Sequence, residues 1–175
     1  MARICIIYAT TDGHTRKICE RLRVLLEAAS HQVTLVSIEH AGALDLSAAD
    51  KIVLGASIRY GRHNPLVLEF VNAHAPLLAA KPNAFFSVNI VARKPHKNRP
   101  ETNPYLQKFL KRTRWRPTEL DVFAGRLDYP RYGLLDRLMI QFIMWLTQGP
   151  TDARSVVEFT DWQRVEAFAQ RVASM

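Results

Sequence analysis

Three threonines, an aspartate, a glycine and a histidine form the segment TTDGHT at residues 10–15. An apolar run precedes this segment and a helical pattern follows it. Backbone N–H groups at such a junction, together with the N-terminal end of the helix, favour binding of an anion. The hydroxyls of Thr10, Thr11 and Thr15 add donors, and Gly13 permits a tight turn. The alternative is an ordinary turn capped by threonines, and the loop alone leaves both interpretations open.

Two further segments carry small and polar residues directly after apolar runs. They are GASIRYGRHN at 55–64 and SVNIVARKP at 87–95. Ligands of doubly wound α/β proteins bind at the carboxyl ends of the strands, so we expect the three loops to line one crevice. The chain lacks G-x-G-x-x-G and G-x-x-x-x-G-K-[ST] motifs, which argues against a dinucleotide fingerprint and a P-loop.

Other kinds of site are not indicated. We find no nucleophile–histidine–acid motif, no Cys/His metal spacing and no paired carboxylates, and the six histidines are scattered. Cys5 and Cys19 fall in apolar patterns, as expected of reduced core residues in the cytosol. A bound redox cofactor would then supply the difficult chemistry.

Alternating strands and helices must position these loops. Apolar runs predict strands at 3–9, 32–39, 51–57, 84–92 and 121–129, and helical patterns occupy 15–30, 64–75, 103–113 and 161–174. The strands show little polar alternation, so helices should cover both faces of the sheet. The 175 residues therefore predict one α/β domain over 1–175, a doubly wound parallel sheet of five strands.

The segment 130–154 does not fit this pattern, because five strands already complete the sheet. We expect it to be inserted between two halves of the fifth strand, the second half being 155–160. Its apolar helix is too short to span a bilayer, which needs about 20 apolar residues. Three interpretations stay open: a helix buried in the core, a dimer contact, and a helix at 131–148 lying on a membrane surface, where Arg131, Arg137 and Trp145 suit the interface.

The formal net charge of +8 indicates an acidic partner. Nucleic acid, anionic lipid and a carboxylate-bearing substrate all qualify, but aromatic residues are not interleaved with the basic ones as on a nucleic-acid platform. Arg93 and Lys94 follow the fourth strand directly and should overhang the crevice. For Lys97, Arg99 and the basic residues at 108–116, a solvated surface is the favoured interpretation.

The loop TTDGHT resembles the phosphate loop of flavodoxins, which bind FMN. The set GASIRYG, FFSVNIVARKP, FLKRTRWRP, YPRY and TDW is more narrowly similar to the bacterial menaquinone-dependent protoporphyrinogen oxidases of flavodoxin-like fold, over nearly the whole chain. This resemblance implies strand order 2-1-3-4-5, with the inserted helix splitting strand five. It also implies FMN-dependent oxidation of protoporphyrinogen IX to protoporphyrin IX in haem biosynthesis. The electron acceptor would be menaquinone or ubiquinone, and the protein would be peripheral on the cytoplasmic face of the bacterial inner membrane.

Carried over by position, the resemblance implies cofactor contacts from all three loops. The residues are Thr10, Thr11, Asp12, Gly13, His14, Thr15, Ser57, Ile58, Arg59, Tyr60, Gly61, Ser87, Val88, Asn89 and Ile90. Arg93 and Lys94 are expected to bind the substrate propionates. Only Tyr60 could flank the flavin ring, so one ring face should be open to substrate. No catalytic acid or base is identified. A flavodoxin-type electron carrier, an NAD(P)H:quinone reductase and a basic binding module remain alternatives, although flavodoxin carriers are typically acidic.

Overall fold

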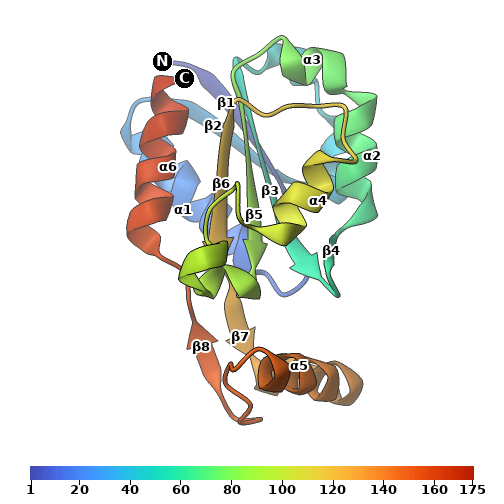
Figure 1. Ribbon diagram of the computed structural model, residues 1–175. Coiled ribbons are helices and arrows are strands. Elements are labelled where there is room, and N and C mark those ends of the chain that lie inside the picture. The colour runs from blue at the N-terminus through green and yellow to red at the C-terminus, as the bar shows by residue number, and fades with distance from the viewer.

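A parallel sheet of five strands forms the centre of the computed structural model, which describes residues 1–175 (Figure 1). Its strands are β1 (Arg3–Ala9), β2 (Gln32–Ser37), β3 (Lys51–Arg59), β5 (Asn83–Asn89) and β6 (Glu119–Ala124). They lie in the order β2-β1-β3-β5-β6, and the short β4 (Arg62–His63) turns back antiparallel to β3. The predicted doubly wound sheet with order 2-1-3-4-5 is confirmed.

Helices cover both faces of this sheet, as its apolar strands require (Figure 1). One face carries α1 (His14–Ala28) and α6 (Trp162–Ser174), and the other carries α2 (Pro65–Ala73), α3 (Ala75–Ala79) and α4 (Pro104–Leu110). Short 3₁₀ segments occupy Ile38–Ala43, Leu46–Ala48, Ile90–Arg93, Pro95–Lys97 and Tyr129–Arg131. Neighbouring strand residues point to opposite faces. Phe86 therefore packs in the α1/α6 layer, and Phe85 packs in the α2/α4 layer.

The helices differ in how their N-terminal ends are satisfied. The side chains of Asn64, Asn103 and Asp161 accept hydrogen bonds from the first turns of α2, α4 and α6, which confirms the helix starts predicted at these residues. Helix α1 has Gly13 at its N-cap position instead, and this residue has φ 84° and gives no side-chain cap. The start of α1 thus keeps free N–H donors.

The insertion leaves the sheet at its carboxyl edge. After Gly125, β7 (Arg126–Asp128) extends beyond the sheet and pairs antiparallel with β8 (Val156–Glu158), and α5 (Leu134–Leu146) lies between them in the chain (Figure 1). The inserted helix is where the sequence predicts it. Residues 156–158, however, do not complete the fifth strand of the main sheet. The segment that returns from beyond this edge runs antiparallel to β7. It therefore pairs with β7 instead of extending β6.

Helix α5 turns most of its apolar side chains outward. Leu135 is 81% exposed, Phe142 58% and Trp145 68%, and Met144 is the one buried residue of the helix. The interpretation of this helix as a core helix is therefore wrong. No helix in the structure has the length and apolar character needed to cross a bilayer.

Gly55 on β3 lies directly beside Phe86 on β5. A Cβ atom at position 55 would come within 2.2 Å of Cζ of Phe86, so Gly55→Ala must displace this ring. We expect the free energy of unfolding to fall by about 1–3 kcal/mol, measured by urea denaturation. Gly42→Ala is the matched control, since no atom lies within 4 Å of its Cβ position. Equal stabilities of the two variants would contradict this packing.

Candidate functional site

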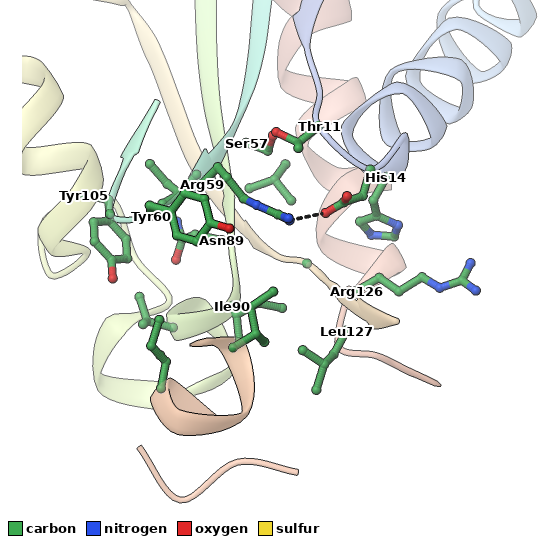
Figure 2. A pocket seen from close by; sticks show the side chains of 18 of the residues that line it. Thr11, His14, Ser57, Arg59, Tyr60, Asn89, Ile90, Tyr105, Arg126 and Leu127 are labelled. Atoms are coloured by element: carbon green, nitrogen blue, oxygen red, sulfur yellow. Dashed lines mark hydrogen bonds and ion pairs between the residues drawn. The ribbon is translucent and has the colours of Figure 1, made fainter. Parts of the chain in front are cut away.

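The loops after β1, β3 and β5 meet in one cavity at the carboxyl ends of these strands (Figure 2). Parallel neighbours end at the same edge of a sheet, so the topology brings the three predicted loops together. Further walls come from α4, from the segment after β6 and from α5. The lining residues are Thr10, Thr11, Asp12, His14, Thr15, Ser57, Ile58, Arg59, Tyr60, Gly61, Val88, Asn89, Ile90, Val91, Tyr105, Gly125, Arg126, Leu127, Tyr132, Ile140, Ile143, Met144 and Thr147.

All the predicted cofactor residues line this cavity except Gly13 and Ser87. Gly13 lines an adjoining polar cavity at the start of α1. Ser87 is fully buried beneath the third loop. The structure thus collects the three loops as expected, and the role of each residue toward a cofactor stays a prediction.

The first loop has the features of an anion site. Thr15 Oγ1 is buried and has no hydrogen-bond partner, and Thr15 lines the cavity. Thr10 Oγ1 accepts a hydrogen bond from the N–H of Gly13 at 3.0 Å, which shapes the turn. A buried hydroxyl without a partner is unfavourable. A phosphate bound at the uncapped start of α1 would accept a hydrogen bond from it, so these residues fit a phosphorylated cofactor.

The second loop connects the first loop to α5. Arg59 pairs with Asp12 at 2.9 Å and with Asp136 of α5 at 2.6 Å, and Figure 2 shows its side chain reaching toward the first loop. The hydroxyl of Tyr60 donates to Asp136 as well. Tyr60 and Gly61 have φ of 49° and 76°, as the central residues of a tight hairpin between β3 and β4 do. This turn places the half-exposed Tyr60 ring at the cavity wall.

A buried polar network supports the third loop. Asn89 Oδ1 accepts hydrogen bonds from the N–H of Ala92 at 3.1 Å and from Asn103 Nδ2 at 3.0 Å. Ser87 Oγ contacts Asn89 Nδ2 at 3.2 Å and His63 Nε2 at 2.9 Å. Burial lowers the pKa of His63 to about 3, so its ring is neutral at physiological pH. His63 therefore supports the loop as a packed, uncharged side chain.

Arg93 and Lys94 do not line the cavity, contrary to expectation. Arg93 donates from Nη1 to the carbonyl of Ile90 at 3.2 Å and from Nη2 to the carbonyl of Thr147 at 2.9 Å. The chain after β5 coils into a 3₁₀ turn, which directs Arg93 to the C-terminal end of α5, where carbonyl groups attract a cation. Nη1 and Nη2 of Arg93 are thus bonded within the protein. Neither Arg93 nor Lys94 lines the cavity, and the propionate role of this pair stays a prediction.

Several cavity residues were missed by the sequence reasoning. Tyr132 belongs to the YPRY segment, and Ile140, Ile143 and Met144 lie on α5. The α5 residues add an apolar wall to the cavity. The apolar pattern of 134–146 was visible, but which of its side chains face the cavity depends on the ribbon of β7 and β8.

Comparisons with known proteins agree with this architecture. Residues 5–154 match the family described as Flavodoxin domain. The chain is 43% identical over 170 residues to the protoporphyrinogen IX dehydrogenase [quinone] of Escherichia coli strain K12, covering 97% of this chain and 94% of that protein. A protein of the same name from Leishmania major is 43% identical over 171 residues, covering 97% and 74%. Among solved structures, oxidised flavodoxin 1 from Bacillus cereus has a TM-score of 0.58 at 15% identity, covering 99% and 98%, and so shares the fold.

Thr15→Val tests the anion site at the first loop. The valine keeps the shape of the side chain and removes the unpartnered hydroxyl, so the apoprotein should keep or gain stability, by up to about 1 kcal/mol. With FMN as the probe for a phosphorylated flavin, affinity should fall about tenfold, because a hydrogen bond to a charged phosphate would be lost. Flavin fluorescence titration and thermal unfolding measure the two effects. Thr34→Val on β2, outside the cavity, is the control. Unchanged FMN affinity would contradict the placement of the phosphate.

Proposed function

Because this chain belongs to the flavodoxin domain family, and within it to the quinone-dependent protoporphyrinogen IX dehydrogenases, we propose that it oxidises protoporphyrinogen IX to protoporphyrin IX, with FMN as cofactor and a membrane quinone as acceptor. One observation carries this proposal. The three strand-end loops enclose a cavity that combines unsatisfied donors of the first loop with an apolar wall from α5. An amphipathic cofactor with a phosphate tail and a planar ring matches both features.

The reaction balances as three two-electron oxidations. Protoporphyrinogen loses six hydrogens, and three quinone molecules become three quinols. A bound flavin supplies the two-electron transfer that links the two half-reactions. The protein then has to bind, orient and shield the reactants.

Residues of this chain fit those tasks. Thr15 and the free N–H groups of α1 would hold the phosphate. The hairpin turn holds Tyr60 at the cavity wall, where it would flank a flavin ring, and the ion pair of Arg59 with Asp12 connects the first and second loops. Ile140, Ile143 and Met144 line the remaining wall and exclude water from it.

The outer face of α5 fits a membrane surface. This face is apolar, whereas the inner residues of the same helix line the cavity. Its exposed apolar residues are Leu134, Leu135, Leu138, Met139, Phe142, Trp145 and Leu146. The basic chain, with a net charge of +8, suits anionic lipid. A helix lying in the cytoplasmic face of the bacterial inner membrane would bring the cavity to a lipid-dissolved quinone. A homodimer formed through the same face is the competing explanation.

The purified protein, loaded with FMN and kept free of oxygen, tests the proposed activity. Addition of protoporphyrinogen IX and a short-chain quinone should produce porphyrin fluorescence, with three quinols formed for each porphyrin. A flavin that stays oxidised under porphyrinogen but is bleached by NAD(P)H would overturn the proposal in favour of a quinone reductase.

A double variant, Leu135→Ser with Phe142→Ser, tests the membrane role of α5. Partition into anionic vesicles should fall by about tenfold or more, because two large apolar side chains no longer enter the lipid. FMN affinity and turnover of a water-soluble quinone should not change, since neither residue lines the cavity. Val24→Ser on α1, where the valine is 51% exposed, is the control in vesicle flotation. Unchanged vesicle binding together with loss of a dimer in sedimentation would instead identify a subunit contact.

A further inference from the structure

Besides the polar cavity at the start of α1, another cavity adjoins the first on the side of α4. Three cations line this second cavity. Gly61 and Tyr105 belong to both cavities, and Tyr105 lies across the first cavity from His14 and Arg126 (Figure 2). The cations are Arg62, Lys108 and Arg112, and Glu69 is the one acidic residue of the lining.

None of these cations is neutralised by a neighbour. The side-chain nitrogens of Arg62, Lys108 and Arg112 have no carboxylate oxygen within 4.0 Å. Glu69 makes no ion pair either. The cations of the first cavity differ, because Arg59 is paired with two aspartates and Arg126 with Asp128 at 2.8 Å. The second cavity therefore offers free positive charge directly beside a cavity whose own cations are already paired.

Local structure explains why the cations converge. Tyr105, Lys108 and Arg112 are spaced by three and four residues, which places them on one face of α4 and its C-terminal turn. Asn103 caps this helix and is bonded to Asn89 of the third loop, so the same network sets both the loop and the helix. The Tyr60–Gly61 turn brings Arg62 of β4 into the lining of the same cavity.

We propose that Arg62, Lys108 and Arg112 bind the propionate carboxylates of the porphyrinogen while its macrocycle lies beside the cofactor that the proposed function places in the first cavity. This inference rests on the proposed function. Both propionates lie on one edge of the macrocycle, so a single cationic surface can receive both. Charge-assisted hydrogen bonds from arginine and lysine are the strong means of holding a carboxylate. The site would thus take the place of the one expected at Arg93 and Lys94. It would fix which edge of the macrocycle points toward α4.

The double variant Arg62→Gln with Lys108→Gln tests this site in the FMN-loaded enzyme. The KM for protoporphyrinogen should rise about tenfold or more, because charge-assisted bonds are lost, while kcat and FMN affinity stay unchanged. Lys111→Gln with Arg114→Gln is the matched control. It removes the same charge from exposed residues of the same surface that line neither cavity. This control should leave the KM within about twofold of the wild type.

The dimethyl ester of protoporphyrinogen separates carboxylate binding from other effects. The wild type should bind the ester less well than the acid, and the Arg62/Lys108 variant should treat the two alike. Equal rises in KM for both double variants, equal effects on acid and ester, or loss of FMN affinity would each overturn the inference. A wild-type enzyme that leaves porphyrinogen unoxidised would overturn the proposed function, and this inference with it. Turnover by the wild type with no difference between the two double variants would overturn the inference alone.

Discussion

Parallel pairing of β1, β3 and β5 is the constraint on which the site depends. Their register brings Ala9 beside Ala56 and Ser57 beside Val88, so three loops far apart in the sequence leave the sheet at one edge. Gly55 makes this pairing possible, because the Phe86 ring occupies the space that a side chain there would need. The helix layers on both faces then keep the edge in place, and the loops are free to carry polar residues.

Helix α5 is held at both ends by residues of the second and third loops. Asp136 near its start bonds to Arg59 and Tyr60 of the second loop, and Thr147 after its end accepts hydrogen bonds from Arg93 of the third loop. The helix therefore cannot shift without disturbing those loops. Its inner side closes the cavity while its outer side is apolar and exposed, so the same thirteen-residue element forms a cavity wall and an apolar surface.

Much of the fold could be predicted from the sequence, because it rests on local patterns. Apolar runs identified the strands, and helical patterns beginning at residues 64 and 103 identified the starts of α2 and α4. The three loops followed from the general rule for strand ends. Arg93 could not be placed, since a 3₁₀ turn of four residues redirects it. The pairing of β8 with β7 and the cations gathered around Tyr105 depend on contacts between segments distant in the sequence, and no periodicity reports those contacts.

The unsatisfied hydroxyl of Thr15 has a consequence for the amount of folded protein in a cell. A ligand that binds only the folded chain raises its resistance to unfolding in proportion to the logarithm of ligand concentration. Newly made chains that meet little flavin would keep the orphaned group and unfold more often, and proteases remove chains that unfold. Flavin supply would in this way set how much of the protein persists, without any dedicated regulator.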